Sequence, residues 1–162
     1  YSYTKNFRFK NGDNIALVNN SYCTFNSQNT RWFKDSYLLM YLPSTCPMRC
    51  TDIWRSLVAN RIAKVNNWGI LFHKPTTIQN RNYHNLMDDF DQEVNSYLYN
   101  EEIYNELLKL KLKSGVKNIG RNLILCYSVF IKKGLLKGEE IKLLKSWIRD
   151  CKIALNKKRN NY

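Results

Sequence analysis

Apolar residues recur at intervals of three and four along the second half of this chain, a pattern that predicts amphipathic helices. One stripe runs from Ile103 to Leu110. A continuous apolar run from Leu123 to Ile131 predicts a buried helix that ends near Gly134. The last stripe consists of Ile141, Leu144, Ile148, Cys151 and Leu155. We therefore expect a mostly α-helical C-terminal region over residues 81–162, packed on the residues before it.

The first half has a different pattern, with short apolar runs between turn signals. The runs at Ile15 to Val18, Tyr37 to Leu42 and Gly69 to His73 predict strands. Between the last two, Trp54 opens an apolar helical spacing that Thr51 or Asp52 can cap. A strand, helix, strand order suggests an α/β layer. The predicted fold class is therefore α/β, with short strands and a capped helix over residues 1–80, then the helical region.

Length and composition indicate a folded piece of a longer protein. Forty-four percent of the 162 residues are hydrophobic, enough for one domain with a core. The chain begins at Tyr1 without a signal peptide, so we expect it to be a fragment. No apolar run approaches the ~20 residues of a membrane span. Any membrane anchor of the parent protein is therefore expected upstream.

The net charge of +13 is unevenly distributed. Residues 1–81 carry eleven Lys or Arg and three acids, residues 82–108 seven acids and no base, and residues 109–162 fifteen bases and three acids. A basic surface attracts phosphate groups of nucleic acids, anionic lipids or nucleotide-sugars. The alternative is a solvated, lysine-rich surface. The five cysteines leave a disulfide open as an alternative, and they lack the spacing of a zinc site.

Two polar clusters have the residue types that bind sugars or move protons. Asn26, Gln28 and Asn29 lie beside aromatic residues and can hold a sugar or a ribose, or they form a polar loop that bonds to its own backbone. Asp52 at a helix start can deprotonate or orient an acceptor hydroxyl, or it can act only as a cap. Trp54 beside it is either a substrate contact or a core residue.

Two further clusters suggest phosphate or metal binding. Arg81 and His84 together can bind a diphosphate or complete a metal shell. The alternative is a helix start with a partly exposed histidine. Asp89 and Asp91 match a D-x-D pattern formally, but they lie in a predicted helix, where their side chains point to different sides. We interpret that run as a solvated acidic face.

Five short blocks occur in an order that resembles the STELLO family of glycosyltransferase-like proteins. The blocks are Asn26 to Thr30, Tyr41 to Pro43, Asp52 to Arg55, Arg81 to His84 and Asp88 to Phe90. The resemblance covers residues 15–105 well and the helical tail more loosely. It implies a Golgi membrane protein of type II topology with a luminal domain of GT-A character. Such a domain is expected to use a UDP-sugar, with UDP-glucose as the expected donor, and a divalent ion of the manganese type.

The resemblance also gives roles to individual residues. Asp52 becomes the acceptor-side carboxylate, with Arg55 orienting it or pairing with phosphate. Asn26, Gln28 and Asn29 become sugar or acceptor contacts, and His84 becomes a metal ligand. We predict Trp54 and Arg81 as further substrate contacts. Because no strand-ending D-x-D precedes Asn26, the nucleotide-binding half is expected to lie upstream, and the fragment alone is expected to be inactive.

Two alternative functions remain open from the sequence. The first is a non-catalytic relative that binds protein partners in the secretory pathway. The second is a basic nucleic-acid-binding module, which predicts bases and aromatics on one surface. Most aromatics here fall in apolar runs. We therefore expect a nucleotide-sugar, an acceptor and possible Golgi protein partners, and no nucleic acid.

Overall fold

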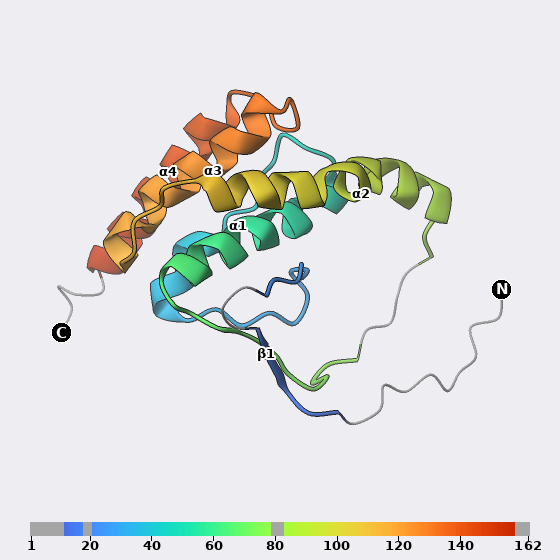
Figure 1. The fold of residues 1–162 in the computed structure, drawn as a ribbon, viewed down its shortest axis with the longest axis horizontal. Helices are drawn as coiled ribbons and strands as arrows, with labels where there is room; N and C mark the ends of the chain where they lie inside the picture. Colours follow the sequence, from blue (N-terminus) through green and yellow to red (C-terminus); the bar gives the residue numbers. More distant parts are fainter. Residues whose placement is uncertain (1–11, 18–20, 79–82, 158–162) are drawn as a thin grey trace.

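Figure 1 shows the computed structural model, which describes residues 12–17, 21–78 and 83–157. Most of these residues are helical, and one small sheet lies away from the helices. The elements in chain order are β1 (Ile15–Leu17), the 3-10 helices η1 (Lys34–Met40) and η2 (Met48–Cys50), α1 (Thr51–Val65), β2 (Ile70–Phe72), α2 (Leu86–Lys109), the 3-10 helix η3 (Val116–Asn118), α3 (Ile119–Lys132) and α4 (Glu140–Lys157).

Helix α1 is the central element of the core. It contacts both α2 and α3, while α4 packs against α3 and η1 (Figure 1). Residues 54–60 of α1 are buried without interruption, so neighbours cover the helix on all sides there. Its largest buried side chain, Trp54, packs against Phe130 of α3 with ring centroids 5.4 Å apart. The same core also takes Leu107 from α2 and Leu144 from α4.

The predicted helix after Thr51 is confirmed, but its cap is different from the prediction. Thr51 and Asp52 are the first residues of α1 itself, and Cys50 holds the cap position without a side-chain hydrogen bond. The Thr51 hydroxyl donates instead to the carbonyl of Met48. The helix ends before Asn66 and Asn67, and Asn67 adopts a left-handed φ of 55°.

The two outer strands of the prediction are confirmed. β1 and β2 pair antiparallel, with Ile15 opposite Phe72 and Leu17 opposite Ile70. Both strands are three residues long and stay half-buried or exposed. They therefore add little to the core, and among the described residues they form the whole of the sheet.

The predicted strand from Tyr37 to Leu42 is wrong. This segment forms the 3-10 helix η1, followed by an extended exit. Ser36 stabilises the first turn of η1, because both its amide and its hydroxyl donate to the carbonyl of Phe33, at 2.9 and 2.8 Å. Only Leu39 of η1 is buried. A short apolar run fits a strand and a short helix equally well, so periodicity alone could not separate them.

The helices of the second half follow the predicted apolar stripes. The acidic segment and the Ile103 stripe, predicted separately, belong to one continuous helix, α2. Helix α3 ends before Gly134, whose φ is +71°. Helices α3 and α4 approach closely at Gly120, where a Cβ atom would lie 3.0 Å from Ile148 Cγ2. Glycine at this position therefore sets how closely the two helices pack.

A buried carboxylate joins the first half of the chain to the last helix. Glu140, at the start of α4, is fully buried and accepts a hydrogen bond from the Tyr41 hydroxyl. It also accepts from the amides of Ser44 and Thr45, at 3.2 and 2.9 Å, and from the Thr45 hydroxyl at 2.6 Å. Burial and this contact raise the pKa of Tyr41. We call these residues the Glu140 clasp.

The fold is thus mixed α/β and mostly helical, as the sequence predicted. None of the described helices has the length and apolar character needed to cross a membrane. The division into two regions at residue 80 stays a prediction. Across that position, α1 and η1 share one core with α2, α3 and α4.

Candidate functional site

Asp52 and Arg55 lie at the beginning of α1 and meet the same residue of the preceding loop. The amide of Ser27 donates to Asp52 Oδ2 at 3.0 Å. Arg55 Nη1 donates to the Ser27 hydroxyl at 3.1 Å. Ser27 therefore links the carboxylate to the guanidinium. Sequence reasoning did not single out this residue, although it lies inside the polar block that drew attention to its neighbours.

Only one oxygen of the Asp52 carboxylate accepts a hydrogen bond in these contacts. Ser27 fixes Oδ2, and no described group donates a hydrogen bond to Oδ1. The side chain is half-buried, in the first turn of a 15-residue helix. Asp52 is therefore oriented through Oδ2, and its Oδ1 is open to a further hydrogen-bond donor.

Arg55 is buried and incompletely hydrogen-bonded. Its residue is 4% exposed, and Nε and Nη2 are buried without a hydrogen-bond partner. The guanidinium carbon lies 5.7 Å from the Phe25 ring centroid and 5.2 Å from that of Trp32. Burial lowers the pKa of Arg55, and nearby Asp52 partly opposes that shift. Two unmet N–H directions on a desolvated cation suit an anionic group.

The polar loop that precedes Asp52 is exposed and partly bonded to itself. Asn26 Nδ2 donates to Gln28 Oε1 at 3.2 Å, and the Thr30 hydroxyl donates to the Asn26 carbonyl at 2.8 Å. Asn29 has a left-handed φ of 51°, and its side chain exchanges hydrogen bonds with the Thr76 hydroxyl. The structure thus brings Asn26, Gln28 and Asn29 beside Asp52. Their role as substrate contacts stays a prediction.

Trp54 does not belong to this surface. It is completely buried, and its Nε1 donates to Asn100 Oδ1 of α2 at 3.1 Å. A side chain enclosed by α2 and α3 has no surface for a sugar, so the prediction of a substrate contact is wrong and the core alternative holds. Trp54 is only two residues from Asp52 in the sequence, but the helical turn between them places it on a different side of α1.

His84 approaches the same end of α1 through Arg49. Arg49 Nη2 lies 3.4 Å from His84 Nδ1, and Arg49 also forms an ion pair with Asp89. Arg49 lies in η2, immediately before α1, and sequence reasoning missed it. The exposed imidazole is therefore near the beginning of α1, although it makes no hydrogen bond to Asp52. Arg81 lies outside the described residues.

The described residues do not provide a metal site on their own. Within them, no group of three His, Cys, Asp or Glu side chains is arranged to hold an ion. The guanidinium beside His84 Nδ1 also opposes a second cation at that nitrogen. All five cysteines are free thiols. A divalent ion at His84 would need Nε2 and ligands from elsewhere.

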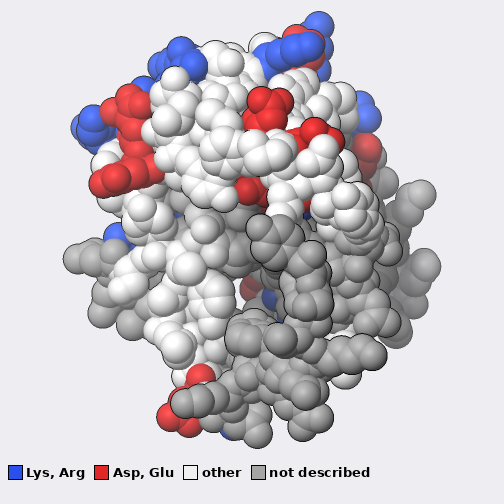
Figure 2. Space-filling view, turned by 90° about the vertical axis from the view of Figure 1, so that its right-hand side faces the viewer, with Lys and Arg blue, Asp and Glu red and all other residues white. Residues whose placement is uncertain are grey.

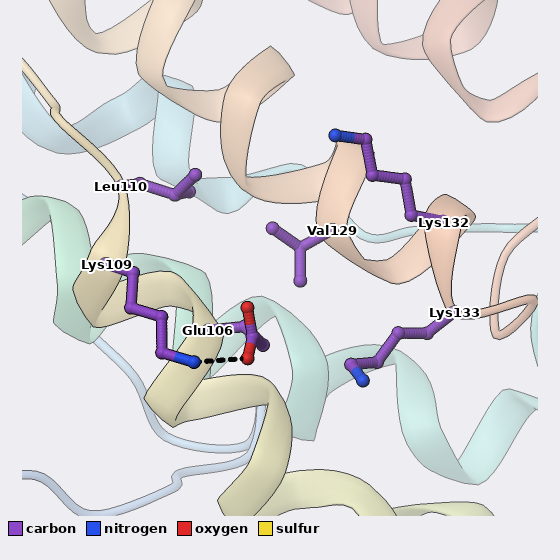
Figure 3. A pocket seen from close by; sticks show the side chains of 6 residues that line it. All are labelled: Glu106, Lys109, Leu110, Val129, Lys132 and Lys133. Carbon is purple, nitrogen blue, oxygen red and sulfur yellow. Dashed lines mark hydrogen bonds and ion pairs between the residues drawn. The ribbon is translucent and has the colours of Figure 1, made fainter.

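A separate groove lies between the end of α2 and the end of α3. Figure 3 shows its lining, which consists of Glu106, Lys109, Leu110, Val129, Lys132 and Lys133. Lys109 is paired with Glu106 at 2.7 Å, and Lys133 is paired with Glu102. None of the predicted site residues lines this groove, so it is distinct from the start of α1.

A family model described as STELLO glycosyltransferases matches residues 49–157. The chain belongs to this family. The match begins at Arg49 and includes Asp52, Arg55 and His84, whereas the loop with Ser27 lies before it. Membership of the STELLO family carries a glycosyltransferase-like function. Neither a curated protein nor a solved structure matches the chain significantly.

Proposed function

We propose that the STELLO protein containing this chain transfers a sugar, most simply glucose, from a UDP-sugar to an acceptor hydroxyl in the Golgi lumen. The observation that carries the proposal is the arrangement of Asp52, Ser27 and Arg55 at the start of α1, inside and beside the family match. A membrane anchor upstream of this chain and protein partners in the Golgi belong to the same proposal.

Asp52 is the proposed acceptor-side base. A carboxylate within hydrogen-bond reach can take the acceptor proton as its oxygen attacks the sugar. The Ser27 amide holds Oδ2, which leaves Oδ1 to face the hydroxyl. Asn26, Gln28 and Asn29 are the proposed contacts to the sugar or the acceptor, because their amide groups are exposed next to this carboxylate.

Arg55 is the proposed partner of a phosphate group of the donor. Its Nε and Nη2 can donate two parallel hydrogen bonds to one phosphate. Since Phe25 and Trp32 lie against the guanidinium, the loop that carries them has to move before the phosphate reaches it. The net charge of +13 would favour the approach of an anionic donor. A divalent ion with His84 as one ligand is also part of the proposal.

Donor hydrolysis and sugar transfer by the full-length protein test the role of Asp52. Asp52→Asn keeps an acceptor for the Ser27 amide and removes the base, so we expect the rate to fall by about 10²- to 10⁴-fold. The matched control is Asp35→Asn, at an exposed aspartate in the first turn of η1, which should keep the wild-type rate.

Equal rates for wild type and Asp52→Asn would remove the catalytic role of Asp52. Absence of transfer by the wild-type protein with every UDP-sugar would favour the non-catalytic interaction protein. Tight, salt-sensitive RNA binding would instead favour the nucleic-acid-binding module.

A further inference from the structure

The N-terminal half of α2 exposes an unusual number of large apolar side chains. Leu86, Met87, Phe90, Tyr97 and Leu98 are each 53–69% exposed. We call these five residues the α2 stripe. The residues of α2 that enter the core are Ser96, Ile103, Tyr104 and Leu107, so the first ten residues of the helix are not buried. Clustered exposed apolar residues of this kind mark interaction sites more often than chance.

The members of the α2 stripe share one face of the helix. Since each residue turns the helix by about 100°, the five positions fall within an arc of about 120°. The rings of Phe90 and Tyr97 lie in contact, with centroids 6.1 Å apart. From Leu86 to Leu98 the stripe is about 18 Å long, at about 1.5 Å per residue. That is the length of a helix-sized docking surface.

The surroundings of the α2 stripe are acidic. Residues 82–108 contain no Lys or Arg and seven acids, which are Asp88, Asp89, Asp91, Glu93, Glu101, Glu102 and Glu106. Arg49, Lys109 and Lys133 pair with three of these. In Figure 2, seen from the end where α2 begins, acidic side chains lie among uncharged residues, and Lys and Arg lie mostly at the edges. Asp91 and Glu101, beside the stripe, make no ion pair among the described residues.

The acidic charge around the α2 stripe indicates which kind of partner can bind there. A second copy that placed its own α2 here would bring seven acids against seven acids, which is unfavourable. The basic helix α4 of a second copy fits poorly, because its apolar residues Leu144 and Ile148 are in the core. A partner helix with large apolar residues on one face and Lys or Arg beside them satisfies both the stripe and its acids.

We propose that the α2 stripe docks a basic amphipathic helix of a partner protein. The stripe supplies the apolar contact, and Asp91, Glu93 and Glu101 set the charge of the partner. This function is independent of the sugar transfer proposed at α1, because none of the stripe residues makes a hydrogen bond, ion pair or ring contact with Asp52, Arg55 or Ser27.

The test uses a synthetic peptide of about 18 residues, with Leu at helical spacing and Lys at the flanking positions. Its matched control carries Glu in place of every Lys. Fluorescence anisotropy with the whole chain should show that the Lys peptide binds at least about tenfold more tightly, and that added salt weakens the difference. Phe90→Ser and Leu98→Ser, at exposed positions, should each weaken binding of the Lys peptide by about tenfold or more.

Leu71→Ser is the control variant, because Leu71 is similarly exposed but lies on β2. It should bind like wild type, and circular dichroism should show all three variants folded. Equal binding of the two peptides, or unchanged binding by both stripe variants, would overturn the proposal. So would self-association of the chain that Phe90→Ser abolishes, since the occupant would then be a second copy.

Discussion

Arg55 and Arg61 lie on the same helix, but their guanidinium groups differ in how fully they are hydrogen-bonded. Arg61 caps the end of α2, because Nε donates to the Leu107 carbonyl and Nη2 to the Leu110 carbonyl, both at 2.8 Å. Arg55 makes one hydrogen bond and leaves two buried nitrogens without one. An arginine whose donors are satisfied contributes to stability, and one whose donors are unmet points to a ligand.

This difference predicts that an Arg→Met substitution lowers the free energy of unfolding by different amounts at the two positions. Arg61→Met should lower the free energy of unfolding by about 2 kcal/mol or more, because two charge-assisted hydrogen bonds are lost. Arg55→Met should change it by less than about 1 kcal/mol, since loss of the ring contacts is offset by relief of a desolvated charge. Urea unfolding of both variants measures this difference. An equal cost at both positions would make Arg55 a structural residue.

The sequence predicted several residues of the candidate site, but it did not predict which residues contact each other. The sequence indicated Asp52 because a carboxylate at a helix start is a common catalytic position, and the family resemblance added Arg55. It could not show that Ser27 meets both, since 25 residues separate Ser27 from Asp52. Glu140 was missed for the same reason. A glutamate in a lysine-rich segment suggests a solvated residue until its contacts with residues 41–45 are known.

At the scale of elements, helix packing depends on Gly120. Gly120→Ala gains about 1 kcal/mol of helix propensity, but its Cβ would press on Ile148. Overpacking of this kind costs about 1–3 kcal/mol, so we expect a net loss of stability. Gly138→Ala is the matched control, because a Cβ there meets no atom within 4 Å. Thermal unfolding that leaves Gly120→Ala at or above wild type would contradict tight packing of α3 on α4.

Elements with long apolar periodicity were predicted well, and short ones were not. Apolar spacing predicted α1 and α4, and a continuous apolar run predicted α3, because each of these helices carries apolar residues over most of its length. It split α2 in two, since the exposed stripe and the buried residues lie on different faces of one helix. It gave a strand for η1 because six apolar residues carry too little periodicity to choose.

Over the whole molecule, buried thiols and phenols predict loss of stability in alkali. Burial raises the pKa of Cys126 to about 12, and it raises the pKa of Tyr127 and Tyr104 as well. The folded state therefore keeps protons that the unfolded state releases, so the free energy of unfolding should fall as the pH rises above about 9. Cys126 alone contributes about 1.4 kcal/mol per pH unit in that range.

Urea unfolding between pH 8 and pH 11 measures this slope. Cys126→Ala should lower stability at pH 8 but fall less steeply with pH, because the titrating thiol is gone. Cys23→Ala, at an exposed cysteine, should keep the wild-type slope. Parallel slopes for Cys126→Ala and wild type would mean that the thiol does not contribute.

The Glu140 clasp also sets the order in which the chain can mature during synthesis. The amides of Ser44 and Thr45 leave the ribosome well before Glu140, which lies 95 residues beyond Thr45. At about 5–20 residues per second, they wait on the order of 5 to 20 s for their acceptor. Until then Tyr41 lacks both Glu140 and the Trp147 ring of the last helix, so the nascent chain exposes an apolar segment that chaperones can bind. Translation of α4 closes that interval.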